Sequence, residues 1–245
     1  HTRSVGVTGV QTCALSISVF WMFLATWLMP LVGVFYFGDD CRLGLDPIRF
    51  FKWASFSYTA WIVLPIVLGI FASMLMVDEN RFGILYQFWI VPVHRSSFFL
   101  SKFLMVMIYA LCFMLVSASA SLISGLLSGC VTPDRDAVVF LFRKCLEIGS
   151  LTAFTTAPVL AAAGTQRGYL LPVCLTIVYT FFGFILLGVN PFLHPISSAM
   201  EIVFRDVPGV VLSRPSNLPD AFFCIGIWCA GSAAAARIRV KGSWI

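Results

Sequence analysis

Residues 58–77 read YTAWIVLPIVLGIFASMLMV and contain no charged side chain. A helix of about 20 apolar residues is long enough to cross the roughly 30 Å hydrocarbon core of a bilayer. A strand of a membrane β-barrel would instead alternate apolar and polar residues over about ten positions. The apolar run ends abruptly at Asp78 and Glu79. The stretch therefore predicts a membrane-spanning helix that is followed directly by a polar segment.

The whole chain has the composition of a membrane protein. Of its 245 residues, 60% are hydrophobic and only 11% are charged, against about 45–50% and about 25% in soluble domains. Backbone polar groups find no water inside a bilayer, so a spanning chain forms either helices or a closed barrel. Because the apolar runs are continuous, we predict an all-α polytopic membrane protein.

Six apolar runs are predicted to cross the membrane. They cover residues 19–37, 58–77, 103–128, 146–164, 169–189 and 221–236. The fourth run is the weakest, because it is rich in Thr and Ala and has charged residues at its entry. An even number of spans places both ends of the chain on the same side of the membrane.

The orientation of the chain is less clearly encoded. Lys and Arg in short loops mark the cytoplasmic side, but they are nearly equal in number on the two sides of the predicted bundle. Arg237, Arg239 and Lys241 directly follow the last span, whereas the basic residues of the opposite side lie in longer loops beside acids. We therefore favour cytoplasmic termini.

Small residues recur at every fourth position on two of the predicted spans. They are Ser117, Ser121, Gly125 and Gly129 on the third, and Gly226, Ala230 and Ala234 on the sixth. Small side chains allow membrane helices to approach closely. We favour packing within one subunit over a dedicated dimer surface.

Ionisable residues are missing near the centres of the first, second, third, fifth and sixth runs. Such residues at bilayer depth are typical of ion-coupled transport. The one candidate is Glu147, which lies four residues after Arg143 and three after Lys144, on the same helix face. We interpret it as part of an ion-paired turn at the membrane interface. An ion-coupled carrier and a scaffold without transport activity remain the alternative functions.

Signatures of enzymes and of metal sites are absent. The sequence has no Gly-x-x-x-x-Gly-Lys-Ser/Thr loop, so we expect neither nucleotide binding of that kind nor enzyme activity in this chain. His1, His94 and His194 lack partners at metal-binding spacing, and His194 is predicted to lie in a Pro-rich outer loop. Cys41 and Cys130 both fall on the outer side and could form a disulfide.

The segment between the second and third runs is richer in polar residues than its neighbours. Phe82, Leu85, Tyr86 and Trp89 recur at helical spacing, which predicts a short amphipathic helix at the membrane interface. Pro92 ends that helix. The alternative is a simple interfacial segment whose basic residues, such as Arg95 and Lys102, bind anionic lipid heads.

This segment resembles that of ABC-2 type transporter permeases. That family has a Glu, a Gly, an apolar stretch, Pro-Val-x-Arg and a Lys after its second span, and this sequence has Glu79, Gly83, Pro92-Val93-His94-Arg95 and Lys102 in that order. The length and the six runs also match. Within the family the chain is most similar to permease subunits of lantibiotic or bacitracin export and self-protection systems.

The resemblance implies a permease in a bacterial cytoplasmic membrane, with a short cytoplasmic coupling helix between helices 2 and 3. A separate ATP-binding subunit would bind ATP and Mg²⁺, and a second permease chain, identical or different, would complete the path; no nucleic acid is expected as a partner. Phe82, Leu85 and Trp89 would fill a groove on the ATPase subunit, and Glu79, Arg81 and Arg95 would pair with its charges. The exported substrate would be an amphipathic peptide, such as a lantibiotic, or a lipid-like compound.

The first seventeen residues do not fit this description. Back-translated in one frame, residues 7–17 resemble a common sequencing-library adapter, except that Ser16 replaces a Pro. We expect residues 1–17 to be an artefact and residues 18–245 to be an N-terminally truncated permease domain of six helices. A genuine short N-terminal tail is the alternative. No function is assigned to Arg3 or Cys13.

Overall fold

The described part of the protein consists of helices and their connections. The computed structural model describes residues 20, 22–38, 46–81, 95–131, 134–166, 168–207 and 217–242, with the backbone alone for 78–81, 95–97 and 236–242. Within these ranges no residue forms a β-strand. The prediction of an all-helical chain is confirmed for this part of the molecule.

The helices follow one another with short connections. In chain order they are an apolar helix Met22–Tyr36, α3 (Pro47–Phe51), the π-helical segments η1 (Lys52–Ser57) and η2 (Thr59–Val63), α4 (Leu64–Arg81), α6 (Arg95–Leu127), α7 (Arg135–Thr155), α8 (Ala157–Ala163), α9 (Leu170–Val189), the 3-10 turn η3 (Pro191–Leu193), α10 (Pro195–Phe204) and α11 (Leu218–Gly242).

Four of these helices are long and apolar enough to cross a membrane. They are Pro47–Val77, Phe98–Leu127, Leu170–Val189 and Leu218–Ala235. They correspond to the second, third, fifth and sixth predicted runs. The second begins earlier than predicted, because the Asp46 side chain caps a helix whose first residue is Pro47, accepting a hydrogen bond from the Ile48 N–H at 3.1 Å. Hydropathy alone missed this turn, since Arg49 and Lys52 interrupt the apolar run.

The other two predicted runs form shorter helices in the described structure. The first is the helix Met22–Tyr36, and the fourth is divided between the end of α7 and α8. Pro158 explains the division, because it has no N–H to donate to the carbonyl of Phe154. The described helices therefore support four spans by length and composition, and six spans remain a prediction.

The outer loop predicted after residue 189 is largely helical and buried. All ten residues of α10 are buried, and so is His194, at 3% exposure. The loop prediction was wrong because two proline residues start helices here. Asn190 caps η3 with Pro191 at its first position, and His194 caps α10 with Pro195 at its first position.

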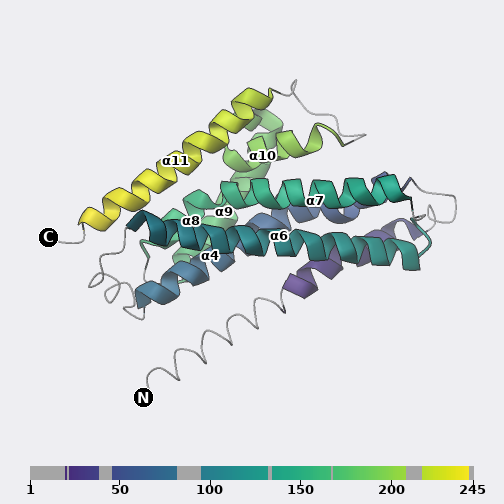
Figure 1. Cartoon of the computed structure of the whole chain (residues 1–245), viewed down its shortest axis with the longest axis horizontal. Helices are drawn as coiled ribbons and strands as arrows, with labels where there is room; N and C mark the ends of the chain where they lie inside the picture. Colours follow the sequence, from purple (N-terminus) through teal and green to yellow (C-terminus); the bar gives the residue numbers. More distant parts are fainter. Residues whose placement is uncertain are drawn as a thin grey trace, which may run out of the picture.

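The core of the bundle lies where α6 and α7 pack against the second span. Figure 1 shows α6 and α7 side by side and running in opposite directions. A Cβ atom added at Gly149 of α7 would lie 3.2 Å from the Ala110 carbonyl oxygen of α6, so the two backbones approach closely. Phe50, Phe113 and Leu141 are completely buried in the same core.

The first stripe of small residues packs within the chain, as predicted. Ser121 of α6 forms a hydrogen bond with Ser55, and a Cβ at Gly125 would meet Val131 and Phe50. The second stripe behaves differently. Gly226, Ala230 and Ala234 are exposed on α11, so the prediction of packing within the subunit is wrong for this stripe.

The outer cysteine prediction is tested only in part. Cys130 is disulfide-bonded, but its partner lies outside the described residues, as does Cys41. Residues 1–17, which we expect to be an artefact, also lie outside them.

Gly69 fixes the distance between α4 and α9, and we expect Gly69→Ala to destabilise the protein by about 1–3 kcal/mol. A Cβ at this position would overlap the side chain of Thr176, whose hydroxyl is held by the Pro172 carbonyl at 2.8 Å. Gly188→Ala on α9 is the control, since a Cβ there meets no atom within 4 Å. Thermal unfolding in detergent measures both. Equal midpoints for Gly69→Ala and the parent chain would contradict the prediction.

Candidate functional site

The predicted coupling segment connects the end of α4 to the start of α6. Glu79 and Arg81 lie in the last turn of α4, and Arg95 is the first residue of α6. Phe82, Gly83, Leu85, Trp89 and Pro92 lie outside the described residues, so the predicted coupling helix is not tested. The structure therefore places both anchors of the segment on long helices of the bundle.

The anchors lie at the same end of the bundle as the end of α8. A Cβ atom at Gly164, just after α8, would lie 3.3 Å from Cε of Met76, near the end of α4. Figure 1 shows the last turn of α4, the first turn of α6 and the C-terminus at one end of the molecule. A displacement of the coupling segment would therefore act on α4, α6 and α8 together.

Lys102 is the one predicted site residue whose side chain is described. It is 9% exposed, and its ammonium lies 5.6 Å from the centroid of the Phe98 ring, one turn earlier on α6. This distance is within the range of a cation–π contact. The contact holds Lys102 along the surface of its own helix.

The break between α7 and α8 is held by side chains from two other helices. The Tyr179 hydroxyl of α9 donates to the Thr155 carbonyl at 2.7 Å, and the Cys229 thiol of α11 donates to the Phe154 carbonyl at 3.3 Å. These bonds satisfy carbonyls near a proline that cannot donate to the helix. The break is thus a defined joint between two half-helices.

The chain after α9 turns back into the bundle. His194 packs against Tyr179, half-way along α9, with ring centroids 4.4 Å apart, and Gly183 leaves the space for this approach. The irregular backbone here is satisfied internally, because the hydroxyls of Ser197 and Ser198 both donate to the Pro191 carbonyl at 2.8 Å. Irregular backbone at membrane depth is tolerated where protein encloses it in this way.

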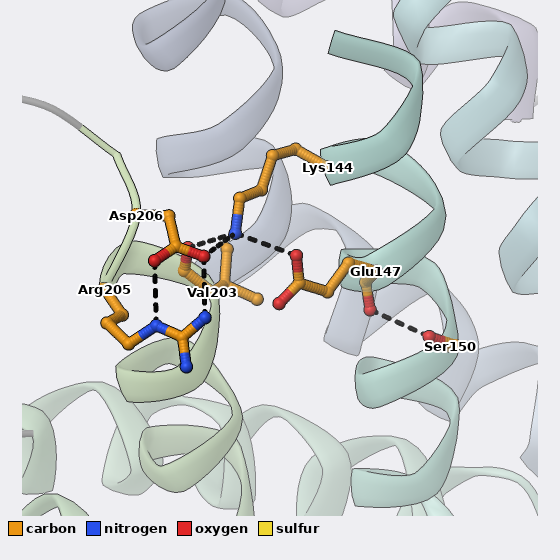
Figure 2. Close-up of polar contacts among 6 residues, drawn as sticks. All are labelled: Lys144, Glu147, Ser150, Val203, Arg205 and Asp206. Carbon is orange, nitrogen blue, oxygen red and sulfur yellow. Dashed lines mark hydrogen bonds and ion pairs between the residues drawn. The ribbon is translucent and has the colours of Figure 1, made fainter. Parts of the chain in front are cut away.

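A charged cluster joins α7 to the end of α10 (Figure 2). The buried ammonium of Lys144 lies 2.8 Å from Glu147 and 3.5 Å from Asp206, and it donates to the Val203 carbonyl at 3.1 Å. Lysine has three N–H donors, so this geometry offers each of them an acceptor. Asp206 also forms two hydrogen bonds with Arg205, both 2.8 Å long.

The cluster is electrically balanced. The bond from Arg205, helped by the nearby charge of Lys144, lowers the pKa of Asp206 to about 2, below its usual value of about 3.9. Asp206 is therefore ionised at neutral pH, and two cations face two carboxylates. The predicted pairing of Lys144 with Glu147 is confirmed, whereas Arg143 is exposed on the other side of the turn.

Comparison with known protein families identifies the chain. Residues 16–183 match the family described as ABC-2 family transporter protein. The chain belongs to this family. The match includes the coupling segment with both flanking helices and ends within α9. No curated protein matches the chain.

Membership of the ABC-2 family confirms the resemblance at family level. With four helices suited to crossing a membrane, the ABC-2 transporter described here is an integral membrane protein, the permease type of component of an ABC exporter. The match does not test the likeness to lantibiotic or bacitracin systems.

Sequence reasoning missed part of the polar interior of this ABC-2 transporter. Glu201 of α10 is 3% exposed, against 29% for the side chain of Glu147, so Glu147 is not the one acidic candidate. Its Oε1 atom has no hydrogen-bond partner among the described residues. The available signal was the pair of cap–proline dipeptides, Asn190-Pro191 and His194-Pro195, which marks two helix starts before an apolar stretch.

Proposed function

We propose that this chain is the permease subunit of a bacterial ABC exporter that is driven by a separate ATP-binding subunit. The family match across the segment from Glu79 to Lys102 carries this proposal. Two permease chains, identical or different, would enclose the path. The permease would lie in the cytoplasmic membrane with six spans and with both termini inside.

In this proposal the segment between α4 and α6 is the coupling element. Its apolar residues Phe82, Leu85 and Trp89 would fill a groove on the ATPase subunit, because buried aromatic anchors dominate the energy of such contacts. Glu79, Arg81 and Arg95 would pair with charges at the rim of the groove and set its register. ATP and Mg²⁺ would bind to the partner subunit.

Closure of the ATPase subunits would then displace the ends of α4 and α6. The contact between Gly164 and Met76 supports transmission from α4 to α8. The joint at Thr155 to Pro158 separates α8 from α7, while the Lys144 cluster holds α7 to α10. A bundle with one movable half-helix and one clamped half-helix is suited to two alternative packings.

The proposed substrate is an amphipathic peptide or a lipid-like compound, with a lantibiotic or another antimicrobial peptide as the leading candidate. The composition of the chain supports this class, since only 11% of its residues are charged. An interior dominated by apolar side chains would solvate an apolar molecule better than an ion.

Reconstitution tests the proposal. The chain is co-expressed with ATP-binding subunits from neighbouring reading frames, purified, and placed in lipid vesicles. We expect stable co-purification and movement of a labelled amphipathic peptide that requires ATP and Mg²⁺ and stops with a non-hydrolysable analogue. Movement at full rate by this chain without an ATPase subunit would overturn the proposal.

The buried carboxyl group of Glu201 favours one second candidate, an ion-coupled carrier, because unpaired ionisable groups inside a bundle are typical of ion pathways. The same vesicles distinguish it. Transport that follows an ion gradient without ATP, and that is lost in Glu201→Gln but kept in Glu147→Gln, would select the carrier. Transport that requires ATP and survives Glu201→Gln excludes this role.

A further inference from the structure

A groove of about 500 Å³ lies between α8 and α11. Its walls include Pro158, Ala161 and Ala162 from α8 and Trp228, Gly231 and Ala235 from α11. Its volume is within the range of sites that hold small organic ligands, about 300–1,000 Å³. The groove is separate from the Lys144 cluster and from the coupling segment.

The walls of the groove are suited to a hydrocarbon chain. Most of the lining side chains are apolar, and the one serine among them, Ser232, donates its hydroxyl proton to the Trp228 carbonyl at 2.6 Å. Pro158 has no N–H to offer. A polar occupant would lose hydrogen bonds to water without replacing them here, whereas an acyl chain would lose none.

The position of the groove indicates where such a chain comes from. Its α11 wall lies inside the candidate span Leu218–Ala235, and Trp228 is 40% exposed. At that depth the surrounding medium is lipid acyl chains. The groove therefore opens toward the hydrocarbon phase.

The end of the groove adds an electrostatic preference. Ala235 is both a wall residue and the last residue of the span, and α11 continues to Gly242. Arg237, Arg239 and Lys241 occupy these last turns, with no acidic residue among them. The helical period of 3.6 residues places position 239 one turn beyond Ala235 on the same face. Basic clusters next to a span attract anionic lipid heads.

We propose that the groove between α8 and α11 binds one acyl chain of an anionic phospholipid, whose headgroup is held by the basic turns at the end of α11. The apolar walls select the chain, and the charge selects the headgroup. The bound lipid covers the outer surface of the half-helix α8 and fills the space beside the joint at Pro158.

Quenching of Trp228 fluorescence tests the proposal. The full chain is reconstituted in phosphatidylcholine vesicles with a minority of phosphatidylglycerol, and bromine atoms are placed on the acyl chains of one lipid or the other. The Trp228 signal is the difference between the parent chain and Trp228→Phe. We expect brominated phosphatidylglycerol to quench this signal roughly fivefold more efficiently per molecule than brominated phosphatidylcholine, as one additional basic contact implies.

Three variants separate the parts of the proposal. Gly231→Leu fills the groove and should remove the preference, whereas Gly226→Leu should retain it, since both glycines have open space at Cβ but only Gly231 lines the groove. Arg239→Gln should reduce the preference by roughly fivefold. Equal quenching by the two lipids in the parent chain would overturn the proposal. So would a Gly231→Leu variant that changes crosslinking between two chains and leaves the lipid preference intact, because the groove would then be a contact between copies.

Discussion

Trp89→Ala should weaken assembly with the ATP-binding subunit by about 30-fold or more and abolish ATP-driven transport. This expectation rests on the proposed function, in which Trp89 is the largest aromatic anchor of the coupling segment. Removing such an anchor from the centre of an interface costs about 2 kcal/mol or more. The remaining contacts at the rim set register and cannot replace the lost apolar surface. Co-purification of the two subunits and transport in vesicles measure the effect.

Phe223→Ala is the matched control for Trp89→Ala. Phe223 is an aromatic residue on α11 that is 70% exposed and lies near the start of that helix, away from the coupling end. It should leave assembly and transport unchanged. A Trp89→Ala variant that assembles and transports like the parent would contradict the coupling role. Protease cleavage of residues 82–94 from the external side would also contradict it, because a cytosolic subunit could not bind there.

Lys144→Met should lower the free energy of unfolding by about 2–3 kcal/mol. The Lys144 ammonium is 3% exposed, and its removal leaves Glu147, Asp206 and the Val203 carbonyl without their shared donor. Breaking a fully buried ion pair costs about 3–5 kcal/mol. The lower figure applies here because the two carboxylates remain 29% and 46% exposed and can gain water.

Arg143→Met provides the control for this change, because Arg143 is the adjacent cation and is exposed. It should alter stability by less than about 0.5 kcal/mol. Thermal unfolding in detergent gives the two values, and hydrogen exchange gives their location. In Lys144→Met, the amides of α10 should lose protection first, since the cluster anchors the end of that helix to α7. Equal loss of stability in both variants would show that the cluster does not clamp α10.

The same cluster gives a stability that depends on pH in a defined direction. The pKa of Asp206 is about 2 in the folded protein and about 3.9 in an unfolded chain. A depressed carboxyl pKa stabilises the folded state fully above the unfolded value, and this contribution is lost as the pH falls toward 2. In Lys144→Met this acid-sensitive part should shrink, because one cation beside Asp206 is gone.

Local sequence patterns predicted the features that depend on nearby residues. The run at residues 169–189 and the helix Leu170–Val189 agree almost to the residue, because continuous apolar composition directly encodes a long helix. The pairing of Lys144 with Glu147 followed from their spacing of three residues on one helix. The family of the chain followed from an ordered motif between two spans.

Features that depend on distant residues were not predicted. Asp206 joins Lys144 across 62 positions of sequence (206 minus 144), and no local pattern indicates that contact. The helix α10 is buried because α7, α9 and α11 surround it, while its own neighbours are prolines and charged residues that are typical of loops. The joint at Pro158 was hidden inside an apolar run, since hydropathy does not register a missing N–H.

The segment from Asn190 to Asp206 has a consequence for the sidedness of the chain. It enters beside the midpoint of α9 at His194 and returns along α10 to the exposed Arg205. An excursion that leaves by the face it entered contributes no net crossing. The directions of α9 and α11 are thus unaffected by it, and the parity of the whole chain depends on the long helices alone.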